Sequence, residues 1–208
     1  MTDQAARASG RKNDPEGLRR RLVEAAYSAF TTRGYRATSV HELKHETGAT
    51  GGALAHHFPT KKDLGLAVLQ DRVADIVEET WIRPIRTATT ASEGIEAVFA
   101  AIIAELEQQG SVSGCPLNNL ALELAWHDAD FRRQIDAIFG RWRDAIADKI
   151  RADQRAGIAS AVDPDAVATF VVATYSGAMA MAKASQSAAP LKTCVEQLAR
   201  IMQAQCMP

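Results

Sequence analysis

The sequence predicts an all-α protein. Three observations support this: alanine, leucine, arginine and glutamate dominate, apolar residues recur every three or four positions, and no β-branched runs alternate with turn signals at strand spacing. With 208 residues, of which 47% are hydrophobic and 24% charged, the chain can bury a sizeable core in one or two domains. This composition excludes a disordered or collagen-like protein.

The first helix is predicted to begin after residues 1–13, a polar segment expected to be a flexible basic arm. Asp14, Pro15 and Glu16 supply a capping carboxylate, a proline suited to a first helical turn, and an acid near the positive helix end. The helix should run to Gly34. Its apolar face comprises Leu18, Leu22, Ala25, Ala26, Ala29 and Phe30, and Arg19, Arg20 and Arg21 lie near its start.

Two short helices joined by a tight turn follow. The first is expected from Val40 to about Glu46, with Thr38 or Ser39 as its cap. Gly48 can adopt a positive φ in the turn, and Thr50 can cap a second helix that ends near His57. This spacing is typical of a helix-turn-helix, whose second helix enters the DNA major groove.

The charge distribution agrees with a DNA-binding N-terminal module. Residues 1–65 carry 11 lysines and arginines against 7 acidic residues, whereas residues 66–208 carry 13 against 18. Four of the 5 histidines also lie in the first part. A basic module on an acidic body indicates that one end of the protein meets a polyanion.

The rest of the chain is predicted to form a helical body. A long connecting helix should run from Lys61 to Trp81 and end before Pro84, followed by helices near 92–109, 116–127, 129–155, 164–186 and 190–205. The expected helix starts are Ser92, Asp128, the pair Asp163-Pro164, and Pro190.

The last two helices are expected to form a dimer interface. One carries small residues at three-to-four spacing: Ala166, Thr169, Ala173, Gly177, Ala180 and Ala184. The other carries an apolar stripe: Leu191, Val195, Leu198 and Met202. Two copies of this pair would make a four-helix interface around a two-fold axis.

Residue types at many fixed offsets resemble the N-terminal domain of TetR-family transcriptional regulators. The matching residues are Leu22, Ala25, Ala26, Phe30, Gly34, Tyr35, Thr38, Ser39 and Val40, then Gly48, Ala49, Thr50, Gly52, Leu54, His57, Phe58, Lys61 and Leu64. Residues 114–123, which read GCPLNNLALE, also look like a segment that recurs in one group of these regulators. The resemblance implies a helix-turn-helix DNA-binding domain at 14–60 and a ligand-binding and dimerisation domain at 61–208. It further implies a homodimer that binds a double-stranded operator and releases it when a small molecule occupies the C-terminal domain.

The resemblance also assigns DNA contacts. Thr38 and Lys61 look like the family's phosphate contacts, and His57 and Phe58 match the end of the recognition helix. Ala55 stands where the family usually has tyrosine, so one backbone contact is lost. We expect Arg19 and Arg20 to add phosphate contacts. The front of the recognition helix comprises Thr50, Gly51, Gly52, Ala53 and His56, and its two glycines predict sparse direct reading of bases.

Cys115 is the candidate sensing residue. With Pro116 at a first helical position, Cys115 is predicted to be the N-cap, where the helix end lowers a thiol's pKa and favours reaction with electrophiles. The alternative is a small buried hydrophobe. Lys183 could stabilise a thiolate or simply complement its own helix end. Asn118 and Asn119 could bind a ligand or satisfy buried backbone.

Other function classes find less support in the sequence. An enzyme using Cys115 with His127 as base would place these residues about 18 Å apart along a helix. His127, Asp128 and Asp130 are adjacent rather than on one face, which argues against a metal site, and no cofactor motif is present. A helical DNA binder without a ligand is the remaining alternative. The polar N-terminus, the three scattered cysteines and the short apolar stretch 166–182 predict a cytoplasmic protein without a membrane span.

The aromatic and sulfur side chains of the body are expected to line either a core or a ligand cavity. They are Trp81, Trp126, Trp142, Phe99, Phe131, Phe139 and Met179.

Overall fold

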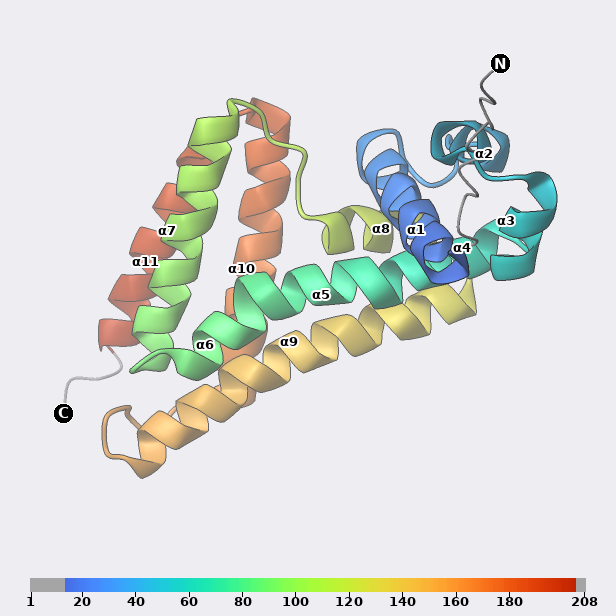
Figure 1. Ribbon diagram of the computed structural model, residues 1–208. Coiled ribbons are helices and arrows are strands. Elements are labelled where there is room, and N and C mark those ends of the chain that lie inside the picture. The colour runs from blue at the N-terminus through green and yellow to red at the C-terminus, as the bar shows by residue number, and fades with distance from the viewer. Residues whose placement is uncertain (1–13, 205–208) are drawn as a thin grey trace, which may run out of the picture.

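The structure, a computed structural model, describes residues 14–204, with side chains to residue 202, so the predicted arm at 1–13 lies outside the described part. All regular elements in that part are helical, as the sequence predicts. Figure 1 shows three helices at one end, joined to a larger helical body. The three are α1 (Pro15–Thr32), α2 (Val40–Thr47) and α3 (Gly51–His57). The body contains α7 (Ala91–Gln109), α8 (Pro116–Leu124), α9 (Ala129–Arg155), α10 (Pro164–Ser185) and α11 (Ala189–Ala204).

One continuous helical rod connects the two parts, and it is longer than predicted. It consists of α4 (Lys61–Val68), η1 (Leu69–Val73), α5 (Ala74–Val77), η2 (Glu78–Ile82) and α6 (Arg83–Thr87), where η1 and η2 are π-helical turns. The prediction that Pro84 ends this helix is wrong. Pro84 lies in the first turn of α6, directly after η2, and the wider π turn accommodates a residue that donates no backbone hydrogen bond.

Most predicted helix starts are confirmed. Asp14, Asp128 and Asp163 accept backbone N–H bonds as N-caps of α1, α9 and α10. Ser92 is not the cap of α7; Thr90 has that role, because its hydroxyl accepts the Glu93 N–H at 3.2 Å.

Two helix ends also differ from the prediction. α8 ends at Leu124 rather than near residue 127, and the Leu124 carbonyl accepts the N–H of Asp128, the residue that starts α9. α11 begins at Ala189, one residue before Pro190.

Aromatic rings fill the centre of the body. Trp81 on the rod lies 4.8 Å from Trp142 on α9, 5.6 Å from Phe99 on α7 and 4.9 Å from Tyr175 on α10, measured between ring centroids. Trp81, Trp142 and Phe99 are each at most 2% exposed. Of the side chains expected in a core or cavity, these rings, together with Phe131, Met179 and the half-buried Phe139, belong to the packed core. Trp126 does not, because it is 86% exposed.

The rod and α9 lie side by side and run in the same direction, away from the three-helix end (Figure 1). Near the three-helix end, Lys62 Nζ lies 2.7 Å from an Asp128 oxygen and 2.5 Å from an Asp130 oxygen. At the far end, Lys149 Nζ donates to the Thr89 carbonyl at 2.8 Å. These lysine contacts therefore fix the two helices to each other at both ends.

The far contact is completed by Asp153, the buried acid of the described core. Its carboxylate accepts the Ala91 N–H at 2.6 Å and pairs with Lys149 Nζ at 3.0 Å. Asp153 is 4% exposed, so these partners compensate for the loss of its hydration. The pair thereby holds the start of α7 against the end of α9.

Replacing this acid should destabilise the protein. In Asp153→Ala the Ala91 N–H loses its acceptor and Lys149 loses its partner, so we expect the free energy of unfolding to fall by about 3 kcal/mol. Urea unfolding measures this change. The matched control is Asp144→Ala, an exposed acid on the same helix. Equal stability of the two variants would contradict the anchoring role of Asp153.

Candidate nucleic-acid interface

The helix-turn-helix forms from local capping. Ser39, not Thr38, caps α2, and its hydroxyl accepts the His41 N–H at 3.2 Å. Gly48 ends α2 with a φ of +65°, a conformation that suits glycine. Thr50 caps α3 and accepts the Ala53 N–H at 3.2 Å. The predicted turn geometry is therefore confirmed, and of the two predicted cap residues, Thr38 and Ser39, it is Ser39 that caps α2.

The front of α3 presents little side-chain bulk. Gly51 and Gly52 are exposed, and a Cβ added to either would meet nothing within 4 Å. Thr50 and His56 are exposed, whereas Ala53 and His57 are half-buried. On the inner side, Leu54 and Phe58 are buried and hold the helix on the domain core. The exposed front is thus nearly smooth backbone, flanked by one hydroxyl and one imidazole.

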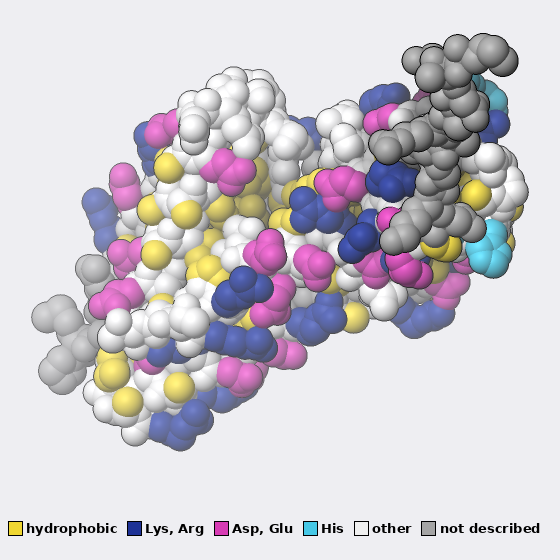
Figure 2. All heavy atoms as spheres, viewed as in Figure 1, with side chains coloured by type: hydrophobic (Ala, Val, Ile, Leu, Met, Phe, Trp, Pro, Cys, Tyr) yellow, Lys and Arg dark blue, Asp and Glu magenta, His cyan; other side chains and the backbone are white. Residues whose placement is uncertain are grey.

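The residues expected to contact phosphate differ in their exposure. Arg20 is exposed, but Arg19 pairs with Asp71 of the rod at 2.6 Å and lies over the Phe58 ring. Thr38 is 2% exposed, and its hydroxyl donates to the Gly34 carbonyl at 2.8 Å. In this conformation the polar groups of Arg19 and Thr38 are bonded to other groups of the same chain. Figure 2 shows lysine, arginine and histidine side chains on the outer part of this domain.

Lys61 stands at the start of the rod, beside the turn that follows α1. Its Nζ lies 4.5 Å from the centroid of the Tyr35 ring and donates to the Arg36 carbonyl at 3.3 Å. Partial burial lowers the pKa of Lys61. The ammonium group is therefore held at the edge of the helix-turn-helix by an aromatic face and a carbonyl.

Glu123 on α8 holds the same turn from the body, and the sequence analysis assigned it no role. Its carboxylate accepts the N–H groups of Tyr35 at 2.9 Å and Arg36 at 2.7 Å. Gly34, with a φ of +92°, brings the backbone close to this carboxylate. Bonds from backbone N–H to a carboxylate are among the stronger hydrogen bonds in proteins. The only sequence signal was the position of Glu123 at the end of the segment 114–123.

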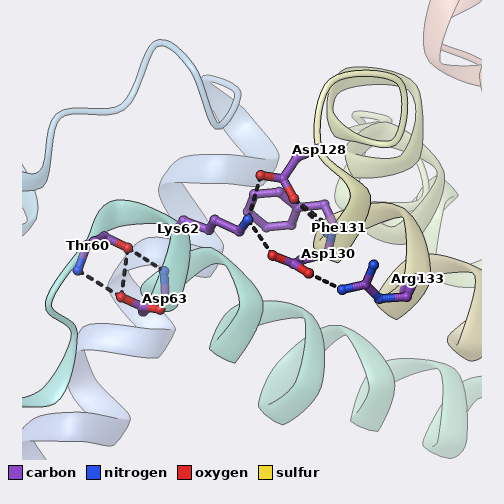
Figure 3. A network of polar contacts seen from close by, with 7 residues as sticks. All are labelled: Thr60, Lys62, Asp63, Asp128, Asp130, Phe131 and Arg133. Carbon is purple, nitrogen blue, oxygen red and sulfur yellow. Dashed lines mark hydrogen bonds and ion pairs between the residues drawn. The ribbon is translucent and has the colours of Figure 1, made fainter.

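A second group of contacts lies beside the first, between the rod and the start of α9 (Figure 3). Lys62 bridges Asp128 and Asp130 at the start of α9, and Asp130 also pairs with Arg133. The hydrogen bond from Lys62 lowers the pKa of Asp128. The Phe131 ring, from the first turn of α9, packs edge-on against Tyr35 with centroids 5.3 Å apart. The turn at 34–37 is therefore fixed by hydrogen bonds and aromatic packing, next to the ion pairs that hold α9 to the rod.

Cys115 is the N-cap residue of α8, as predicted, but the expected effect on its thiol is wrong. The side chain is 7% exposed, and burial raises the pKa of the thiol, although the Asn118 and Leu117 N–H groups and Tyr175 oppose that shift. Asn119 donates to the Ser113 carbonyl and accepts from Lys183 Nζ at 3.4 Å. Asn118 donates to the Ser176 carbonyl on α10 at 3.3 Å. The structure thus brings Asn119 and Lys183 together beside Gly114, at the start of the helix whose N-cap is the buried Cys115.

An apolar cavity of about 190 Å³ lies at the end of the body remote from the helix-turn-helix. Its walls come from the starts of α7 and α10, the ends of α9 and α11, and the loop 156–163; Ile150, Val162, Val167 and Met202 contribute apolar groups. Asp153 also lines it. For scale, a cavity of about 150 Å³ in another protein holds benzene. Among residues 14–204, no three potential metal ligands cluster.

Comparison with known protein families identifies the family to which this chain belongs. Residues 22–68 match the family described as "Bacterial regulatory proteins, tetR family", and residues 91–197 match "Transcriptional regulator LmrA/YxaF-like, C-terminal domain". The chain belongs to the TetR family. The resemblance found in the sequence is therefore confirmed, as is the fold class: an N-terminal helix-turn-helix domain and a C-terminal helical domain. It is a transcriptional regulator of TetR type with a DNA-binding domain.

Relatives within the TetR family match over most of their length. The HTH-type transcriptional repressor DhaR of Mycobacterium sp. (strain GP1) is 28% identical over 84% of this chain and 86% of its own. The regulator LmrA of Bacillus subtilis (strain 168) is 22% identical over 86% of this chain and 95% of its own. A TetR regulator from Chloroflexus aurantiacus J-10-FL has a similar structure, with a TM-score of 0.79 and 26% identity, covering 92% of this chain and 96% of that one.

Removing the Glu123 carboxylate should loosen the junction between the domains. In Glu123→Ala the Tyr35 and Arg36 N–H groups lose a charged acceptor, so we expect the free energy of unfolding to fall by about 1–3 kcal/mol. Glu123→Gln keeps one acceptor oxygen and should lose less. Urea unfolding provides the measurement, with Glu79→Ala, an exposed acid on the rod, as control. A loss no larger than that of the control would count against the contact.

Proposed function

We propose that this protein is a ligand-responsive repressor that binds a pseudo-palindromic operator as a homodimer. The observation that carries the proposal is the exposed front of α3, which is free to approach a base-pair edge closely because it carries two glycines. In a two-fold dimer, two such helices would read half-sites about 34–36 Å apart or a multiple of this. The repressor named DhaR is similar over most of the chain, which supports the direction of regulation.

Thr50, Ala53 and His56 are the proposed base contacts, with Gly51 and Gly52 allowing close approach. Thr50 and Ala53 offer a hydroxyl and a methyl group, and His56 offers a ring nitrogen one turn later. Few polar groups face the bases, so the shape and deformability of the DNA would carry much of the specificity. Lys61 and Arg20 remain our proposed backbone contacts, and His57, at the end of α3, is a further proposed DNA-binding residue. Arg19 and Thr38 can join them only after giving up their present partners.

The exposed face of α10 supports the homodimer. All six small residues of the predicted stripe on α10 are exposed: Ala166, Thr169, Ala173, Gly177, Ala180 and Ala184. The predicted contribution of α11 needs correction. Leu191 and Leu198 are buried within the chain, and Val195 and Met202 pack against the same core, so that stripe serves the monomer. α10 is long and apolar enough to cross a membrane, but its opposite face, with Val171 and Tyr175, belongs to the described core.

Two places in the body are proposed for the inducing signal. The first is the Cys115 cluster with Asn118, Asn119 and Lys183, where modification would enlarge a group at the start of α8. The second is the remote cavity, whose lining residue Asp153 joins the start of α7 to the end of α9. A coupling of about 1–3 kcal/mol at either place would weaken operator binding roughly 5–150-fold. The alternative, a DNA binder without a ligand, is favoured if neither place accepts a molecule.

The proposed phosphate contacts and base contacts can be distinguished by how DNA binding depends on salt concentration and on DNA sequence. Lys61→Ala should weaken binding to all duplexes and reduce the slope of log affinity against log salt by about one, because one phosphate contact is lost. His56→Ala should instead change the enriched sequence. Selection from random duplexes and binding titrations at several salt concentrations measure both effects. Lys192→Ala, which removes a cation paired with Glu107 on the body, is the control. Failure to enrich any sequence with the parent protein would contradict the operator proposal.

The thiol proposal makes a separate prediction. Because burial raises the pKa of Cys115, its alkylation by maleimide should be slow at neutral pH and should accelerate as the pH rises above the ordinary thiol range. Once alkylated, the protein should release its operator, and Cys115→Ser should not respond. Mass spectrometry and DNA binding report the two steps, with Cys194→Ser as the matched control. Retained DNA binding after confirmed alkylation of Cys115 would leave only a reversible ligand.

A further inference from the structure

One wall of the remote cavity is the loop 156–163, which connects α9 to α10. Gln154 Nε2, near the end of α9, donates to the Ser160 carbonyl at 2.9 Å and to the Val162 carbonyl at 2.8 Å. The Asp153 carbonyl accepts two further N–H groups of the loop, at 2.9 and 3.3 Å. These four hydrogen bonds fix the loop on α9. The cavity therefore has a defined shape, as ligand sites usually do.

Most of the cavity wall is apolar, and its size limits what can enter. Ile150 on α9, Val167 on α10 and Met202 on α11 line a volume of about 190 Å³. This volume suits one aromatic ring with a small substituent, because a cavity of about 150 Å³ holds benzene. Ile158 also lines the cavity and is 52% exposed, so the cavity reaches the surface at the loop. A small molecule can enter there, whereas a peptide is too large.

A buried carboxylate distinguishes this cavity from a purely apolar one. Asp153 lines the cavity and is 4% exposed. An ionised carboxylate offers about four acceptor positions. Within the described part of the chain, the Asp153 carboxylate bonds to the Ala91 N–H and to Lys149 Nζ. It can therefore accept a further hydrogen bond from a molecule in the cavity.

The charges at the cavity restrict the class of that molecule. The Asp153 carboxylate repels an anion. A cation would lose its hydration in the apolar site and gain little in return, because Lys149 Nζ already pairs with the carboxylate at 3.0 Å. A neutral molecule with an O–H or N–H group meets neither penalty and supplies the donor that the carboxylate can accept.

We propose that the remote cavity binds a neutral, mainly apolar molecule of about the size of one substituted aromatic ring, which donates a hydrogen bond to Asp153. The inference rests on the proposed ligand-responsive repressor and deepens it by naming the class of inducer. Asp153 holds the start of α7, and its partner Lys149 donates to the Thr89 carbonyl just after the rod. A molecule bonded to Asp153 would therefore act on the junction between the rod and α7.

Calorimetric titration of the full-length protein with four small molecules tests the ligand class. Phenol and toluene have nearly the same shape, but only phenol has a donor; benzoate and protonated benzylamine carry charges. We expect phenol to bind with a dissociation constant at or below about 1 mM, and both charged molecules to bind at least about tenfold more weakly.

The comparison of phenol with toluene tests the bond to Asp153. A cavity that offers no acceptor would favour toluene by more than about tenfold, because burying a hydroxyl without a partner is costly. A phenol affinity that equals or exceeds this limit supports the bond. A larger preference for toluene overturns the proposed ligand class, and so does tighter binding of either charged molecule.

Two substitutions that fill the cavity test the location. Ala159→Leu in the loop and Val167→Phe on α10 add bulk to the cavity wall, so each should weaken phenol binding at least about tenfold. Ala161→Leu is the matched control, because Ala161 is an exposed residue of the same loop that does not line the cavity. Thermal unfolding identifies which variants are folded, and either folded cavity variant decides the outcome. Phenol affinity equal to that of the control overturns the inference.

Operator binding separates this inference from the proposed function. Phenol that binds in the cavity and weakens operator binding supports both. Phenol binding that is sensitive to Ala159→Leu but leaves operator affinity unchanged supports the cavity site and contradicts its role in induction. A parent protein that binds neither phenol nor toluene overturns the inference, whereas operator release on alkylation of Cys115 would still support a responsive repressor.

Discussion

The orientation of the two domains relative to each other depends on Glu123, whose carboxylate accepts hydrogen bonds from two backbone N–H groups. The turn at 34–37 has no regular structure of its own, and it joins α1 to the helix-turn-helix. Without a partner from the body, the Tyr35 and Arg36 N–H groups would bond only to water. The carboxylate converts this turn into a docking point, and the Tyr35 ring then packs between Phe30 and Phe131. The position of the recognition helix is therefore set by α8 as well as by the connecting rod.

The parallel pair of the rod and α9 gives this docking point a rigid support. Lys62 joins the two helices at one end, and at the other end Lys149, paired with Asp153 of its own helix, donates to the Thr89 carbonyl just after the rod. Between these ends, Trp81 and Trp142 pack against each other with Tyr175 and Phe99. Close-packed aromatic groups resist continuous deformation, so a displacement at one end is transmitted along the pair. This arrangement allows a change in the remote body to reach the DNA-binding domain.

The sequence predicts features whose cause is local. The caps at Asp14, Thr50, Asp128 and Asp163, and the positive φ at Gly48, each depend on a few neighbouring residues. The use of Ser39 rather than Thr38 as the cap of α2 does not depend on neighbouring residues alone. Thr38 is buried by packing that only the folded domain provides. The continuation of the rod through Pro84 depends on the preceding π turn, which carries no recognised sequence signal. The inward direction of Leu191 and Leu198 likewise follows from tertiary packing, since an apolar stripe fits a core and an interface equally.

Cys115 and Glu123 show how far a local argument extends at the candidate site. The N-cap position of Cys115 was predictable from the sequence, but the direction of the shift in the thiol pKa was not. The helix N-terminus lowers that pKa and burial raises it, and the two effects differ in size. A helix N-terminus stabilises an anion by about 0.3–1 kcal/mol. Full burial shifts a pKa by up to about 3–5 units, each worth about 1.4 kcal/mol. Burial therefore dominates at Cys115. Ionisation of Cys115 is therefore disfavoured by its position at the buried start of α8, while Glu123, at the other end of the same helix, holds the turn at 34–37.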